Sequence, residues 1–257
     1  VLNTIKSVNL LNHKSLKKYF CISTDKATTP INMMGASKRI MELFLYSFQD
    51  TVNISTARFA NVAFSDGSLL DSFRQRLQSR QPISAPIDVR RYFLTDTEAA
   101  ELCLFSVFLG ASQDIFMPKL SSKIQATSFK EICEKFLQAS GYEPYVCQSE
   151  DEARNFVICD KSKMWPCYFF NSDTTGEKEI EAFFCEGDMV NHSKYDDISI
   201  MKINSQADQA KLMKFIEQLE KIREKKNWSK SQLVKLFRDL LDDFDHEELN
   251  KDLDQKM

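Results

Sequence analysis

The chain has 257 residues, of which 43% are hydrophobic and 28% are charged, and its formal net charge is -3. This composition is typical of a globular protein that buries a real core, and it excludes a disordered chain. Lysine and arginine are scattered among acidic residues along the sequence, so the overall charge gives no sign of a nucleic-acid binder.

The sequence also excludes several classes of site and location. Its longest apolar run, residues 102–110, is far shorter than the roughly 20 residues that a membrane-spanning helix needs, and no signal peptide opens the chain. The seven cysteines form no CxxC pair, which is typical of reduced thiols in a cytoplasmic protein. The three histidines lie far apart in polar stretches, so we expect no metal site.

The first elements alternate between helix and strand. Apolar spacing predicts a helix over residues 1–12, a buried strand over 18–23, a helix over 33–49 and a second strand over 52–58. A polar loop separates the first strand from the second helix. This order is typical of a parallel α/β sheet.

The same alternation continues to about residue 141. We expect helices over 69–80, 97–110 and 128–141, and strands over 91–95 and 114–118. Short strands are expected over 166–170 and 198–203, and residues 206–257 are charged and helical. Ser229 and Gln232 predict a capping box for a helix that begins near Lys230.

Polar side chains follow the first strand directly, in the run Ser23-Thr24-Asp25-Lys26. Ligands of open α/β sheets bind outside the carboxyl ends of the strands. Two hydroxyls, a carboxylate and an ammonium supply the acid and the base for a proton transfer next to a carbonyl. Such residues also occur as ordinary solvated loops, so the tetrapeptide by itself is a weak signal.

Longer motifs carry a family resemblance. The run ISTDKATTPINMMGASKR (residues 22–39) resembles the active-site segment of the extended short-chain dehydrogenase/reductase superfamily. More narrowly, it is similar to the UDP-N-acetylglucosamine 4,6-dehydratase group of polysaccharide-biosynthesis proteins. Further matches are ARFANV (57–62), SDGSLLDSF (65–73), RRYFLTDTEAAEL (90–102) and WPCYFFNSDTTGEKEIEAFF (165–184). Together they cover most of residues 1–185 in the order of the family.

The resemblance implies a reaction and a set of catalytic roles. In the family, NAD or NADP oxidises the sugar at C4, and the ketone makes the C5 proton acidic. Lys26 would then remove that proton, Asp25 would protonate the departing C6 hydroxyl, and Thr24 would hydrogen-bond the sugar. Lys38 matches the lysine of the YxxxK motif, which holds the nicotinamide ribose, and Ser23 is expected beside the cofactor.

Met34 departs from the usual family pattern, because many relatives have a tyrosine at this position. Met34 and Lys38 are four residues apart and so share a helix face. A thioether cannot accept a proton, so the C4 hydroxyl proton must pass elsewhere, to Asp25 or through Thr24. A subset of the dehydratase group is similar in having MGASK here. Met34 therefore favours membership of that subset over an inactive protein.

The resemblance also implies residues that bind the nucleotide sugar. Asn61 matches the family asparagine near the sugar, although a strand-end asparagine also serves turns. Ser65, Gly67 and Ser68 are expected near the nucleotide. Arg91 resembles the arginine that clamps the diphosphate, a role that suits a planar guanidinium. Arg90 is the weaker candidate for that role.

The resemblance implies an α/β fold: the C-terminal part of a Rossmann-like doubly wound parallel sheet, a smaller substrate-binding region and a helical C-terminal cap. We predict a partial Rossmann-like domain over residues 1–141, a mixed α/β region over 142–204 and the cap over 205–257. No GxxGxxG turn, which seats a pyrophosphate on a helix N-terminus, occurs in the sequence. We therefore expect a fragment that lacks the N-terminal cofactor half and that alone binds NAD(P) poorly and is inactive.

Two alternatives to the dehydratase stay open. A nucleotide-sugar 4-epimerase on the same scaffold needs no C5 base and no C6 acid, so the Thr24-Asp25-Lys26 run disfavours it. A non-catalytic remnant that binds or assembles is favoured by Met34 and by the missing Gly-rich turn. The expected partners are a UDP-sugar substrate and, on family precedent, further copies in a homo-oligomer. We expect no nucleic acid partner, no membrane segment and a cytoplasmic location.

Overall fold

A computed structural model describes Asn3 and residues 18–47, 52–120, 124–159, 161–173, 175–203 and 208–248. The helix expected over residues 1–12 lies outside these residues, apart from Asn3. Within the described part of the chain, no helix is long and apolar enough to cross a membrane.

The chain divides into two compact units that are interleaved along the sequence. The large-sheet unit comprises residues 1–60, 97–120 and 182–247, and the small-sheet unit comprises residues 61–96, 121–181 and 248–257. From the sequence we predict three consecutive regions, over residues 1–141, 142–204 and 205–257. The units interleave because the chain leaves the large sheet after β2, returns to it for β7, leaves again, and returns for β12.

A five-stranded sheet forms the centre of the large-sheet unit, in the order β1-β2-β7-β12-β11. Strands β1 (Lys18–Thr24), β2 (Asn53–Phe59) and β7 (Asp114–Pro118) run parallel. Strand β12 (Ile198–Lys202) pairs antiparallel with β7, and β11 (Val190–Asn191) pairs antiparallel with β12. All five residues of β7 are buried, as expected for a parallel strand covered on both faces. The expectation of a Rossmann-like parallel α/β fold is confirmed.

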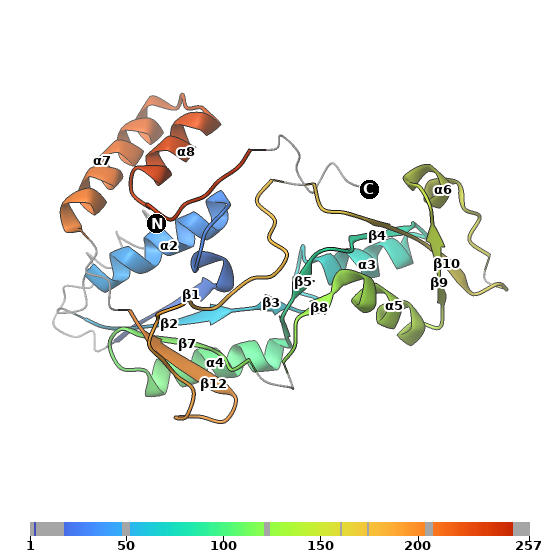
Figure 1. Cartoon of the computed structure of the whole chain (residues 1–257), viewed down its shortest axis with the longest axis horizontal. Coiled ribbons are helices and arrows are strands. Elements are labelled where there is room, and N and C mark those ends of the chain that lie inside the picture. Colours follow the sequence, from blue (N-terminus) through green and yellow to red (C-terminus); the bar gives the residue numbers. More distant parts are fainter. Residues whose placement is uncertain are drawn as a thin grey trace. The chain divides into compact units, whose positions relative to one another are not determined.

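Helices of the C-terminal cap pack on the helix that follows β1. Figure 1 shows α7 (Gln209–Lys225) and α8 (Lys230–Arg238) beside α2 (Met33–Ser47). One apolar core joins the three helices and includes Ile40, Phe44, Phe215 and Phe237. Among the described residues, this unit also contains the helix α4 (Asp96–Leu109). The predicted start of α8 is confirmed, because the Ser229 side chain accepts a hydrogen bond from the Gln232 N–H at 3.2 Å.

The small-sheet unit is built on a three-stranded parallel sheet in the order β4-β10-β9. These strands are β4 (Ile83–Pro86), β10 (Met164–Phe170) and β9 (Glu143–Cys147), and the helices are α3 (Leu69–Gln78), α5 (Phe129–Ala139) and α6 (Glu150–Asn155). The core of this unit gathers around Trp165, whose indole N–H donates to the Gln81 carbonyl at 3.1 Å. This bond satisfies the one polar atom of a buried tryptophan side chain.

The strand expected over residues 91–95 is instead two short strands. Strand β5 (Arg90–Arg91) pairs antiparallel with β8 (Thr127–Ser128), whereas β6 (Phe93–Leu94) pairs parallel with β3 (Asn61–Val62). The chain therefore changes partners at Tyr92, and this change interrupts the strand. Apolar patterning within one segment does not report such a switch, because it depends on two segments elsewhere in the chain.

Candidate active site

The polar run after β1 forms a tight turn at the carboxyl end of that strand. Residues Asp25–Ala27 make a single 3₁₀ turn, η1, and Thr24 is its N-cap. The Thr24 hydroxyl accepts from the Lys26 N–H at 3.4 Å, and the Thr28 N–H donates to the Asp25 carbonyl at 3.1 Å. These hydrogen bonds stabilise the backbone conformation of the turn. They therefore position the side chains of Thr24, Asp25 and Lys26 at the end of β1.

Asp25, the acidic residue of this turn, has 1% of its surface exposed. Its Oδ1 accepts from the Thr24 hydroxyl at 2.8 Å, the Lys26 N–H at 2.8 Å and the Lys26 ammonium at 3.2 Å. Its Oδ2 is buried and has no hydrogen-bond partner among the described residues. A buried carboxylate oxygen left without a donor is costly. The arrangement suits a site where a ligand supplies the missing hydrogen bond.

The first turn of α2 contacts this loop. The Asn32 side chain accepts the Gly35 N–H at 2.8 Å. A β-carbon placed at Gly35 would lie 2.4 Å from the Lys26 carbonyl oxygen, so only glycine allows the helix to approach the turn so closely. Met34 is 47% exposed, and the Lys38 ammonium donates to the Ile22 carbonyl of β1 at 3.2 Å. Ser23, at the end of the same strand, is buried.

A buried ion pair lies behind the turn. Arg58 of β2 donates to both carboxylate oxygens of Glu42 on α2, at 2.9 and 2.8 Å. It also donates to the Thr28 hydroxyl at 3.3 Å and to the Phe183 carbonyl at 2.5 Å. Burial raises the pKa of Glu42, but the charge and hydrogen bonds of Arg58, helped by Arg39, lower it below its ordinary value. Through these bonds Arg58 connects β2 with α2, with the loop after η1 and with the chain at Phe183.

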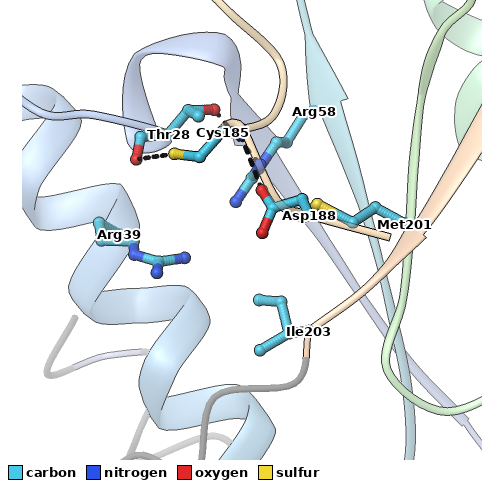
Figure 2. A pocket seen from close by; sticks show the side chains of 7 residues that line it. All are labelled: Thr28, Arg39, Arg58, Cys185, Asp188, Met201 and Ile203. Atoms are coloured by element: carbon cyan, nitrogen blue, oxygen red, sulfur yellow. Dashed lines mark hydrogen bonds between the residues drawn. The ribbon is translucent and has the colours of Figure 1, made fainter. Parts of the chain in front are cut away.

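A small pocket with a volume of about 120 Å³ lies beside Arg58, and Figure 2 shows the side chains that line it. Its lining residues are Thr28, Arg39, Arg58, Cys185, Asp188, Met201 and Ile203. The Cys185 thiol lies 3.7 Å from the Thr28 carbonyl, and burial together with Asp188 raises the pKa of the thiol. Ligand pockets usually occupy about 300–1,000 Å³. This pocket therefore suits a few water molecules rather than a sugar nucleotide.

The predicted nucleotide-side residues belong to the small-sheet unit. Asn61 lies in β3, and its N–H donates to the Tyr92 carbonyl at 3.1 Å. Ser65 and Gly67 form the turn that leads to α3, with Gly67 at a φ of 72°. Ser68 is the N-cap of that helix. The capping role of Ser68 is a structural one, and its expected place near the nucleotide stays a prediction.

Arg91 is buried and already surrounded by protein partners. Its guanidinium donates to the Glu177 carboxylate at 2.8 Å and to the Lys178 carbonyl at 2.8 Å. Arg90 is exposed, and its guanidinium donates to the Ala126 carbonyl at 2.8 Å. A diphosphate would have to displace partners of Arg91, whereas Arg90 is the more accessible of the two cations.

Sequence reasoning missed Gly35, Glu42 and Arg58 as parts of the site. Gly35 and Arg58 stand inside the quoted motifs, but nothing in the sequence pairs Arg58 with a glutamate 16 residues earlier. The pairing arises because β2 lies next to β1 in parallel register, with Arg58 opposite Ser23.

Comparison with known proteins supports the family resemblance that the sequence motifs indicate. Residues 1–203 match the family model described as "Polysaccharide biosynthesis protein". An uncharacterized membrane protein, MJ1061, from Methanocaldococcus jannaschii is 29% identical over 56% of this chain and 45% of its own length. The capsular polysaccharide biosynthesis protein CapD from Staphylococcus aureus is 28% identical over 55% of this chain and 24% of its own.

Two further similarities are to a curated protein and to a solved structure. A UDP-glucose 4-epimerase from Rickettsia canadensis is 27% identical over 52% of this chain and 42% of its own length. The solved structure of Pen from Bacillus thuringiensis superposes with a TM-score of 0.62 at 17% identity, over 80% of this chain and 58% of that protein. The chain thus spans about half or less of the length of these curated relatives.

Proposed function

Because the chain belongs to the family of polysaccharide biosynthesis proteins, we propose that it carries the catalytic residues of a nucleotide-sugar 4,6-dehydratase acting on a UDP-N-acetylglucosamine-like substrate. The motifs of residues 22–39 and the similarity to a capsular polysaccharide biosynthesis protein support this proposal. The seven free cysteines support a reducing, cytoplasmic compartment.

One observation carries the proposal, the contact between the buried Asp25 and Lys26. The Lys26 ammonium lies 3.2 Å from Oδ1 of Asp25, and Oδ2 of the same carboxylate has no hydrogen-bond partner among the described residues. A dehydration next to a ketone needs a base for the C5 proton and an acid for the C6 hydroxyl. A lysine side chain and a carboxyl group in contact bring together a group that can take the C5 proton and a group that can supply a proton to the C6 hydroxyl. An epimerase has no use for such a pair.

A proton path follows from the hydrogen bonds of the turn. With Met34 in place of a tyrosine, the C4 hydroxyl proton passes to Asp25, through the Thr24 hydroxyl 2.8 Å from Oδ1. Asp25 then gives this proton to the C6 hydroxyl, which leaves as water. Lys26 takes the C5 proton and later returns it to C5. The protons balance, because the one lost from the C4 hydroxyl departs in the water.

Hydride transfer requires NAD or NADP, which when bound would accept a hydride from C4 and return it at C6. Of this chain's residues, Lys38 would hold the nicotinamide ribose. Lys38 is half-buried as a residue, and its ammonium donates to the Ile22 carbonyl near the end of β1, which fits that role. Ser23 would lie beside the cofactor. The sequence holds no Gly-rich turn for the pyrophosphate, so tight binding needs residues beyond these.

Residues of the small-sheet unit would hold the nucleotide sugar. Asn61 would contact the sugar, and the turn containing Ser65, Gly67 and Ser68 would contact the nucleotide. Arg91 would clamp the diphosphate after releasing its present partners.

The second candidate is a 4-epimerase, favoured by the similarity to a UDP-glucose 4-epimerase. The two reactions differ in mass balance and in chemistry at C5. We would express the protein from its full reading frame, incubate it with UDP-N-acetylglucosamine in D₂O, and follow the sugar by mass spectrometry and NMR. A dehydratase loses one water and gains deuterium at C5. A C4 epimer without loss of mass would refute the dehydratase in favour of the epimerase.

Substitution of Gly35 tests whether the approach of α2 positions Lys26. The new β-carbon of Gly35→Ala would lie 2.4 Å from the Lys26 carbonyl oxygen, so the turn must shift. A misplacement of about 1 Å can cost roughly a hundredfold in rate. We expect kcat to fall by at least about tenfold, while Ser37→Ala on the same helix leaves it near the wild-type value. An unchanged kcat for Gly35→Ala would contradict the positioning role.

A further inference from the structure

The end of α7, the start of α8 and the residues that join them carry an excess of positive charge. Residues 221–235, here called the basic turn, contain six cations and one carboxylate, Glu224. All six cations are exposed: Lys221, Arg223, Lys225, Lys226, Lys230 and Lys235. The whole chain has a net charge of -3, whereas the basic turn is locally positive.

A tryptophan lies in the middle of the basic turn. Trp228 is 59% exposed, whereas the other tryptophan of the chain, Trp165, is 1% exposed. The turn is well formed on both sides: Lys226 is the left-handed C-cap of α7, and Ser229 is the N-cap of α8. Capped helices on both sides therefore hold the indole out toward solvent.

A cleft between α7 and α8 adjoins the turn, with a volume of about 360 Å³. Lys221, Lys225 and Lys235 line it, and Ile222 and Leu236 add apolar surface. Glu217 pairs with Lys221 at 2.5 Å, and Asp239 also lines the cleft. Three lysines against these two carboxylates leave the cleft positive. Cations beside apolar side chains match an amphiphile with an anionic headgroup.

We propose that the basic turn is a peripheral binding surface for bilayers that contain anionic phospholipids. Clustered lysine and arginine side chains are attracted to anionic lipid headgroups, and an exposed tryptophan partitions into the interfacial region of a bilayer. RNA would be drawn to the same cations, but a single-stranded nucleic acid is usually held on several stacked aromatic side chains. The apolar side of the cleft and the lone indole favour the lipid surface.

The test is sedimentation of the protein with vesicles of phosphatidylcholine alone or of equal parts phosphatidylglycerol and phosphatidylcholine. We expect binding only to the anionic vesicles, and release in about 1 M salt, where the Debye length is about 3 Å. In a Trp165→Phe background, the fluorescence of Trp228 should shift to the blue as the indole enters the bilayer interface.

A matched pair of variants locates the surface. The triple variant Lys225→Gln, Lys226→Gln and Lys230→Gln should weaken vesicle binding by roughly a hundredfold, since each lysine contributes about fivefold near an anionic surface. The control variant Lys130→Gln, Lys135→Gln and Lys161→Gln removes the same charge from the small-sheet unit and should bind nearly as the wild type. Equal binding to neutral vesicles, equal loss in both variants, or binding to RNA without binding to vesicles would overturn the proposal.

Discussion

Lys26→Ala and Asp25→Asn are each expected to lower the rate of water loss from the nucleotide sugar by about 10²–10⁴-fold, the usual contribution of a general acid or base, but at different steps. Without Lys26, C4 can still be oxidised, so reduced nicotinamide should accumulate while C5 exchanges no deuterium. Without the Asp25 carboxylate, the C4 hydroxyl proton has no acceptor, so little reduced nicotinamide should form. Rapid mixing with absorbance detection of the reduced nicotinamide separates the two.

The comparison requires that both variants fold. Thr29→Ala changes an exposed residue of the same loop, and it should leave the rate and the thermal unfolding close to those of the wild type. Loss of water at the wild-type rate by Lys26→Ala would refute its role as the C5 base. Reduced nicotinamide in Asp25→Asn at the wild-type level would refute the proton path from C4 through Asp25.

Local signals in the sequence are sufficient to predict several elements of the large-sheet unit, which contains the candidate catalytic turn. The run KYFCIS predicts β1, which the structure extends by one residue to Thr24. The amphipathic pattern after residue 33 predicts α2, and the Ser229 cap predicts α8. Each of these elements has a local signal of its own, either a run of apolar residues, an amphipathic spacing or a capping residue, and such a signal can be recognised without knowing its neighbours.

Other features depend on pairings that no local pattern encodes. Strand β9 contains Pro144, and β4 spans only four residues and ends at Pro86. Both are outer strands of their sheet, where proline is tolerated but weakens a strand prediction. The Arg58–Glu42 pair and the unpartnered Oδ2 of Asp25 likewise depend on strand register and on burial. The motifs single out the candidate site residues, whereas the contacts that support them could not be predicted from the sequence.

Arg58→Met is expected to destabilise the protein by about 3–5 kcal/mol, because it leaves the Glu42 carboxylate buried and without its main partner. The double variant Arg58→Met, Glu42→Leu removes both charges and should recover most of this loss. The exposed Arg154–Glu150 pair provides the control: Arg154→Met should cost less than about 1 kcal/mol. Urea unfolding at neutral pH measures the three differences.

The pH dependence of the Arg58→Met penalty separates loss of charge pairing from loss of packing. The folded-state pKa of Glu42 lies below its ordinary value, chiefly because Arg58 outweighs the effect of burial. The pair's contribution to stability is therefore present above about pH 4.3, the ordinary pKa of a glutamate, and is lost as pH falls through the lower folded-state pKa. In the variant, only Arg39 of the two cations Arg58 and Arg39 remains to oppose the effect of burial, so we expect the pKa of Glu42 to rise and its carboxylate to become neutral on mild acidification. The penalty should shrink between neutral pH and about pH 4.3. A penalty that stays constant over this range would mean that Arg58 stabilises the protein through packing and its bonds to Thr28 and Phe183.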